Sequence, residues 1–159
     1  MNCYVISACA GAELGESDLP ACMRIIDEGE AVDIEAATEN IPKALYVAIV
    51  RKNGEIVGVG AIKHRRPPYA RAVASVRKSD YAFDENMHEL GYVAVTKAHR
   101  GKQLSKRIVS ELLERYAGPL FATTSNPAMK RTLDDAGFVQ RGVEWEGQSG
   151  NRLSLWIKA

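Results

Sequence analysis

The sequence predicts a mixed α/β or α+β domain built around one sheet. Short apolar runs with strand character alternate with segments whose apolar residues recur at helical spacing. Asn53-Gly54 separates two apolar runs, which predicts a β-hairpin closed by a two-residue turn. Further on, an apolar run at 92–95 leads into a cationic turn and then into an amphipathic segment. A chain of 159 residues is long enough for its own core, and we expect residues 1–159 to form a single domain.

The first half of the chain carries clear signals for helix ends and turns. Pro20 fits the first turn of a helix capped by the preceding Ser-Asp pair, and Pro42 stops a second short helix. Gly58 and Gly60 lie in the strand that returns from the hairpin, where glycine indicates a bulge or a close backbone approach. The expected elements are a strand at 4–7, a helix from 17 or 18, a helix at 34–40, and strands at 44–50 and 56–62.

Residues 64–87 are the hardest part of the sequence to interpret. Pro67-Pro68 breaks the preceding strand, residues 69–76 suit a short basic helix, and residues 79–86 resemble a loop. A connection of this length between regular elements is often functional.

The rest of the chain returns to a regular alternation of strands and helices. Gly118-Pro119 ends one helix, Asn126-Pro127 opens the next, and Gly137 ends that one. The first of these helices has one apolar face, formed by Leu104, Ile108, Val109, Leu112, Leu113 and Tyr116. The expected elements are a strand at 89–95, a helix at 103–116, a strand at 120–123, a helix from 126, and strands at 138–143 and 152–157.

Composition is that of an ordinary soluble globular protein, with 46% hydrophobic and 26% charged residues. No run of about 18 apolar residues occurs, so we expect no membrane span, and the N-terminus lacks the basic start of a secretory signal. Cys3, Cys9 and Cys22 do not form a disulfide framework, and no cysteine and histidine cluster indicates a metal site. We therefore expect a cytoplasmic protein without a metal cofactor.

The net charge of +1 hides an uneven distribution of charge along the chain. Residues 1–42 hold nine acids and one base, a net charge of −8, whereas residues 56–79 hold six cations and no acid. One surface could meet anions and another cations, although two solvated faces explain the pattern equally well. The nearly neutral total argues against a dedicated nucleic-acid coat protein.

The segment 89–108 is the most informative part of the chain. Its apolar strand ends at Val95, a cationic turn follows at 99–102, and a helix begins near Gln103. A strand that feeds a turn and a helix N-terminus presents several backbone N–H groups at one point, which suits a phosphate. Cations at this end oppose the helix dipole and so favour a bound anion. The segment therefore predicts a site for a cofactor that carries a pyrophosphate.

The order of elements and two motifs resemble the GNAT superfamily of acyl-CoA-dependent N-acyltransferases. That family carries Gln/Arg-x-x-Gly-x-Gly/Ala after a strand that ends in Ala-Val; here Arg100-Gly101-Lys102-Gln103-Leu104-Ser105 follows Ala94-Val95. Its second landmark is an asparagine with a Gly-Phe pair eleven residues later, which Asn126 and Gly137-Phe138 match. The resemblance covers roughly residues 14–158 and is strongest over 89–138.

The resemblance implies a mostly antiparallel central sheet flanked by about four helices, with acetyl-CoA (coenzyme A) as co-substrate. The central strand would bind the pantetheine arm through its backbone, and the turn and helix start would hold the pyrophosphate. Asn126 would hydrogen-bond the arm, although it suits a helix N-cap equally well. The implied cofactor-binding residues are Val93, Ala94, Val95, Arg100, Gly101, Lys102, Gln103, Leu104, Ser105 and Asn126.

Three positions depart from the family pattern. Gln103 replaces the first glycine of the motif, and its side chain would either crowd the pyrophosphate or hydrogen-bond it. Ser105 replaces the final glycine or alanine, which is a small change. Leu133 stands where many relatives have a tyrosine that protonates the departing thiolate. Another group, a water, or no acid at all would serve here.

Glu89 is the candidate general base, because histone-acetyltransferase members of the family carry a catalytic glutamate at this place. A carboxylate at a strand end can also serve only in an ion pair. Neighbouring residues of a strand point to opposite faces, so His88 would not share its site. Ser125 is the candidate acid for the thiolate, and Tyr92 is an alternative.

The acceptor is the least determined part of the interpretation. Acidic residues in the first two expected helices suit a cationic amine, whether a small molecule or a protein or peptide, and the basic segment 63–78 suits a nucleic-acid-linked acceptor. The leading hypothesis is acetyl transfer to a primary amine by direct attack in a ternary complex. The alternatives are a catalytically degenerate acyl-CoA-binding sensor or interaction module, and an acyltransferase acting on a nucleic-acid-linked acceptor. We expect no membrane partner, and a homodimer is possible.

Overall fold

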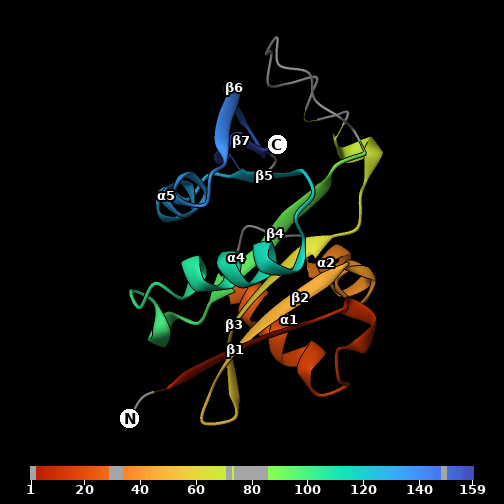
Figure 1. The fold of residues 1–159 in the computed structure, drawn as a ribbon, viewed down its shortest axis with the longest axis vertical. Coiled ribbons are helices and arrows are strands. Elements are labelled where there is room, and N and C mark those ends of the chain that lie inside the picture. Colours follow the sequence, from red (N-terminus) through yellow and green to blue (C-terminus); the bar gives the residue numbers. More distant parts are fainter. Residues whose placement is uncertain (1–2, 29–33, 71–72, 74–85, 148–149) are drawn as a thin grey trace. The chain divides into compact units, whose positions relative to one another are not determined.

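The computed structural model describes residues 3–28, 34–70, 73, 86–147 and 150–159 (Figure 1). Seven strands hydrogen-bond in the order β1-β2-β3-β4-β5-β7-β6. Their contacts divide the chain into two compact units, one formed by residues 1–64 and 90–117 and the other by residues 65–89 and 118–159. β4 (His88–Val95) contributes its first two residues to the second unit and the others to the first. The two units are described separately.

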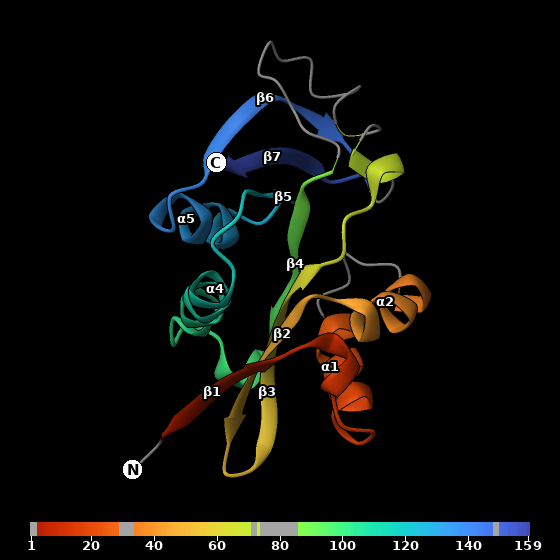
Figure 2. The ribbon, with the colours of Figure 1, turned by 45° about the vertical axis from the view of Figure 1, so that its right-hand side comes forward.

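The first unit is a sheet with helices on both of its faces. Its strands are β1 (Tyr4–Cys9), β2 (Tyr46–Lys52), β3 (Glu55–Lys63) and most of β4, and its helices are α1 (Asp18–Glu28), α2 (Ile34–Asn40) and α4 (Leu104–Arg115). α1 and α2 cover one face of the sheet, and α4 covers the other (Figure 2). Short 3-10 turns at Gly11–Glu13, Ile41–Lys43 and Lys97–His99 connect these elements.

The predicted hairpin and its glycines are confirmed. Asn53 and Gly54 both have positive φ, as a two-residue hairpin turn between paired residues Lys52 and Glu55 requires. A bulge follows between β2 and β3, next to Gly58. A Cβ atom on Gly60 would lie 2.4 Å from Cγ2 of Ile108, so the absence of a side chain there lets α4 pack against β3.

The second unit contains a smaller sheet with helical segments on both faces. β5 (Leu120–Thr124) pairs in parallel with the start of β4, and β7 (Arg152–Lys158) pairs antiparallel with both β5 and β6 (Val139–Glu146). α5 (Pro127–Asp135) lies on one face, and the helical residues 67–70 lie on the other (Figure 2). Ser154, Leu155, Trp156 and Ile157 of β7 are all buried, because both faces of this strand are covered.

The predicted mixed fold with a mostly antiparallel sheet and about four helices is confirmed, and the structure corrects several boundaries. The helix expected at 103–116 begins at Leu104, and the strand expected at 138–143 continues to Glu146. Pro67-Pro68 begins a helical turn, whereas the sequence indicated only a break there. The rest of the helix expected at 69–76, apart from Tyr69, Ala70 and Val73, and most of the loop expected at 79–86 lie outside the described residues. None of the described helices is long and apolar enough to cross a membrane.

Candidate active site

The turn between β4 and α4 is the place where the sequence predicts a phosphate site. Gly101 has φ of 80°, and Gln103, the N-cap of α4, has φ of 59° in the left-handed region. The side chain of Gln103 makes no capping hydrogen bond, and the first turn of α4 holds no acid. The first backbone N–H groups of a helix lack intrahelical partners, so this end is suited to an anion.

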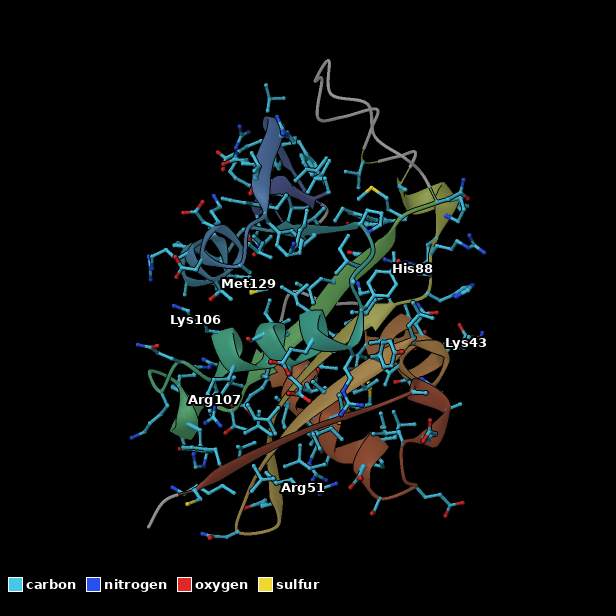
Figure 3. All side chains as sticks on the ribbon, in the orientation of Figure 1. Lys43, Arg51, His88, Lys106, Arg107 and Met129 are labelled. Carbon is cyan, nitrogen blue, oxygen red and sulfur yellow. The ribbon has the colours of Figure 1, made fainter. Side chains whose placement is uncertain are left out.

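The turn carries exposed cationic side chains and one buried apolar side chain. Lys102, Lys106 and Arg107 are exposed, and Figure 3 shows the last two at the beginning of α4. Leu104 is buried, and Ser105 is half-buried behind it. The exposed side of the turn is therefore cationic, and the buried side chain of Leu104 fixes the turn to the core.

Arg100, the first residue of the motif, forms a hydrogen bond across the turn. Its Nε donates a hydrogen bond of 3.0 Å to the backbone carbonyl of Val95, the last residue of β4. The strand end is itself tied to β3, since the backbone N–H of Thr96 donates to the carbonyl of Val57 at 2.9 Å. Arg100 therefore links the strand to the helix start across the turn.

Two contacts from distant parts of the first unit hold the 3-10 turn at 97–99. The Tyr4 hydroxyl of β1 lies 2.9 Å from Nδ1 of His99, and the two rings meet edge to face. A carboxylate oxygen of Glu28, the last residue of α1, accepts a 3.0 Å hydrogen bond from the backbone N–H of Lys97. No local pattern in the sequence indicates either contact, because the partners lie 95 and 69 positions apart in the chain.

β4 has an irregular backbone in its middle. Tyr92 has φ of 54°, which is rare for a residue with a large side chain, and its ring packs in the core below α1 and α2. Nζ of Lys63 lies 4.0 Å from the centre of that ring, in cation–π geometry. β4 pairs with β5 through two residues only: His88 pairs with Leu120, and Glu89 pairs with Phe121. Val93, Ala94 and Val95 lie past the end of this ladder.

Glu89 is buried in the second unit and is paired with an arginine. It is 5% exposed, and its Oε1 accepts a 2.9 Å hydrogen bond from Arg66. The guanidinium carbon of Arg66 lies 4.6 Å from the centre of the Tyr69 ring. Glu89 therefore takes part in an ion pair, which is compatible with a role as a base.

Tyr69 extends this cluster along β5. Its hydroxyl lies 2.9 Å from Oγ1 of Thr123, and its ring stacks with Phe121 at a centroid distance of 6.3 Å. Because Glu89 lies beside Phe121 in the ladder, and Thr123 follows two residues later, all three side chains share one face of the sheet. Arg66 and Tyr69 were not among the predicted site residues. The Arg66-Pro67 pair could have indicated a residue with a fixed backbone, but it does not indicate that Arg66 contacts Glu89.

Asn126 and Ser125 lie where β5 ends and α5 begins. The side chain of Asn126 accepts hydrogen bonds from the backbone N–H groups of Ala128 and Met129, so Asn126 is the N-cap of α5. Ser125 is half-buried beside it. Leu133, at the position of the family tyrosine, is fully buried, so no acid replaces that tyrosine there. Among the described residues, no group of three or more His, Cys, Asp and Glu side chains could hold a metal ion.

Comparisons with known proteins identify the family and the fold. Residues 15–138 match the sequence profile of the Acetyltransferase (GNAT) family. No curated protein sequence matches the chain. Among solved structures, ElaA of Escherichia coli has a TM-score of 0.69 at 17% identity, with 99% of this chain and 100% of that chain covered.

Two further structures share the fold at low identity. A GNAT acetyltransferase of Streptococcus agalactiae has a TM-score of 0.71 at 13% identity, covering 97% of this chain and 96% of its own. The ribosomal-protein-S18-alanine N-acetyltransferase of Escherichia coli has a TM-score of 0.68 at 15% identity, covering 98% and 92%. At these identities the likeness concerns the fold alone.

Proposed function

Because the chain belongs to the Acetyltransferase (GNAT) family, we propose that it transfers an acetyl group from acetyl-CoA to a primary amine. The amine attacks directly, in a complex that holds both substrates. The observation that carries this proposal is the turn between β4 and α4, in which Gly101 and Gln103 adopt positive φ. The turn leaves the first turn of α4 uncapped by a side chain and free of acids.

The residues of the first unit suit the cofactor's two chemically different parts. The pyrophosphate takes hydrogen bonds from the backbone N–H groups at the start of α4 and charge from Lys102 and Lys106. The amide groups of the pantetheine arm pair with the backbone of Val93 and Val95, in the manner of an added strand. In the second unit, Asn126 uses its amide oxygen to cap α5, which leaves its amide nitrogen as a hydrogen-bond donor.

The transfer needs one bond to form and one to break. The neutral amine nitrogen attacks the thioester carbonyl carbon and forms the C–N bond; the C–S bond then breaks, and the sulfur leaves with its electron pair. The proton lost by the nitrogen passes to Glu89, directly or through a water. The thiolate takes a proton from Ser125 or from water, since Leu133 offers none.

The acceptor is a cationic amine, either a small molecule or a protein or peptide. Exposed carboxylates on α1 and α2, among them Asp27, Glu35 and Glu39, support this proposal, because they attract ammonium groups from solution. The protein itself acts in the cytoplasm under this proposal.

Calorimetric titration tests the cofactor step. We expect acetyl-CoA and CoA to bind with micromolar dissociation constants and pantetheine, which lacks the pyrophosphate, to bind far more weakly. Equal binding of CoA and pantetheine would show that the turn holds no phosphate. No binding of either would remove the proposal and leave the basic segment 63–78 and polynucleotides to be examined.

An amine panel with detection of the released thiol tests the chemistry. Glu89→Gln should lower the rate at neutral pH and leave the acetyl-CoA affinity nearly unchanged, whereas Ser125→Ala should lower it less, because water replaces the hydroxyl. An unchanged rate for Glu89→Gln across pH would rule out Glu89 as base. Binding without any turnover would favour the sensor alternative.

A further inference from the structure

We propose that Arg66 is a positioning residue of the acyl-transfer reaction, which holds the buried carboxylate of Glu89 in one orientation. The inference rests on the proposed function and adds a residue that the family motifs do not contain. Its basis is the cluster of Arg66, Glu89, Tyr69 and Thr123, all of which lie in the second unit.

The backbone of Arg66 is fixed by its neighbours. A residue before proline is restricted to extended conformations, and Pro67 follows Arg66 directly. The carbonyl of Arg66 accepts a 3.0 Å hydrogen bond from the backbone N–H of Ala70, so Arg66 forms the start of the helical turn 67–70. Ala70 is fully buried and anchors this turn in the core. The point from which the arginine side chain departs is therefore set before any substrate arrives.

The side chain of Arg66 is fixed as well. Its guanidinium lies over the ring of Tyr69 and donates to Glu89 at 2.9 Å. Tyr69 is held in turn by its hydroxyl contact with Thr123 and by stacking on Phe121. An arginine held by a stack and an ion pair has lost most of its rotamer freedom, so it imposes one position on the carboxylate.

Stability alone does not account for this pair. The side chain of Glu89 is 6% exposed and that of Arg66 is 34% exposed, so the carboxylate has left water while its partner still reaches it. The desolvation of a buried ion pair generally cancels most of its attraction, and apolar residues of the same size often serve stability as well or better. The pair does, however, place a carboxylate with a hydrogen-bonding partner at a buried position, where a carboxylate without a partner would be costly.

A carboxylate held in one orientation is what the proposed reaction requires of Glu89. A carboxylate without a fixed partner would sample several rotamers, and a base contributes only when it lies within hydrogen-bond reach of the proton it takes. Arg66 thus acts through Glu89 and need not touch either substrate.

The test compares Arg66→Gln and Arg66→Lys with Arg65→Gln, which removes the same charge from the exposed neighbouring residue. We expect Arg66→Gln to lower kcat by about 10- to 100-fold, the equivalent of one lost charge-assisted hydrogen bond. Arg66→Lys should recover part of this loss, because it restores the charge without the planar stack. Arg65→Gln should leave kcat within about twofold, and the acetyl-CoA dissociation constant should stay within about twofold in all three.

A double-mutant cycle with Glu89→Gln separates positioning from a structural role. In the Glu89→Gln background we expect Arg66→Gln to change kcat by less than about twofold, because the group it positions is already gone. The double variant removes both charges, so it avoids the unpaired buried carboxylate that destabilises Arg66→Gln. An equal loss of kcat in both backgrounds, or a loss of acetyl-CoA binding, would overturn the proposal. A wild-type rate in Glu89→Gln would overturn it while leaving the transferase activity intact, and absence of turnover in the wild type would overturn the proposed function itself.

Discussion

The hydroxyl of Tyr4 lies 2.9 Å from Nδ1 of His99, and this contact ties the first strand to the 3-10 turn that precedes Arg100. Tyr4→Phe keeps the edge-to-face packing of the rings and removes only the hydrogen bond. We expect a loss of about 1 kcal/mol in the free energy of unfolding and a melting temperature lower by about 2–4 °C. Acetyl-CoA affinity should fall by up to about tenfold, because binding must then order the turn.

Tyr46→Phe is the matched control for that experiment. Tyr46 is half-buried in β2, and within the described residues its hydroxyl has no hydrogen-bond partner. Its removal should shift the melting temperature by less than about 1 °C and leave the acetyl-CoA affinity unchanged. Equal effects of the two variants would mean that the Tyr4–His99 contact contributes nothing to the turn.

Gln103 and Gly101 should respond in opposite directions to substitution. Gln103 has φ of 59°, a conformation that costs a residue with a side chain about 1–2 kcal/mol, so Gln103→Gly should raise stability by about 1 kcal/mol or leave it unchanged. Gly101 has φ of 80° with open space around it, so Gly101→Ala should cost about 1 kcal/mol from the backbone alone. Chemical denaturation measures both.

Calorimetry of Gln103→Gly tests how the glutamine side chain affects acetyl-CoA binding. We expect Gln103→Gly to bind acetyl-CoA as tightly as the wild type or more tightly, because the backbone keeps its shape and the side chain no longer crowds the pyrophosphate. Weaker binding by more than about threefold would show that the amide of Gln103 contacts the phosphates.

Most helix ends and turns could be predicted from local residue preferences, whereas contacts between residues far apart in the chain could not. Asn53-Gly54, Pro20 and Gly137 mark turns and helix ends through backbone preferences that act over a few residues, and the elements next to them were located within a few positions. Glu89 pairs with Arg66, 23 positions earlier in the chain, and no spacing rule connects the two residues. Only the fold brings the two together.

Unusual backbone conformations were the second feature that the sequence did not predict. A glutamine at the motif's glycine position suggested crowding of a phosphate, but nothing in its side chain indicates a positive φ. The same holds for Tyr92, an ordinary strand residue by composition, whose irregular conformation lies in the middle of β4. Such conformations are imposed by surrounding packing and appear at functional sites more often than elsewhere.

Gly60→Ala should disturb the packing of α4 more than Gly58→Ala does. An added Cβ would lie 2.4 Å from Ile108 at position 60 but 3.3 Å from its nearest neighbours at position 58. We expect a cost of about 1–3 kcal/mol for Gly60→Ala and less than about 1 kcal/mol for Gly58→Ala, measured by chemical denaturation. Equal costs would indicate that α4 moves freely to accept the methyl group.

Cys22 should be unreactive in the folded protein. It is fully buried on α1, and burial raises the pKa of its thiol from 9.0 to about 12, so almost no thiolate exists at pH 8. Cys3 is exposed, and burial, with help from Glu13 and Asp18, raises the pKa of Cys9. A thiol reagent at pH 8 should label Cys3 first and Cys9 more slowly, and Cys22 only after denaturation. Labelling of Cys22 at the rate of Cys3 would contradict its burial.

The raised pKa of Cys22 also predicts how stability changes in alkali. Below pH 9 the thiol is protonated in both the folded and the unfolded chain, so it has no effect on the pH dependence. Between pH 9 and about 12 the unfolded chain loses this proton and the folded chain keeps it, so the free energy of unfolding falls by up to about 1.4 kcal/mol per pH unit from this group. Lysines and tyrosines titrate in the same range, so the informative quantity is the difference between the wild type and Cys22→Ala. The variant should lose stability less steeply above pH 9, and parallel curves would show that the thiol titrates alike in both states.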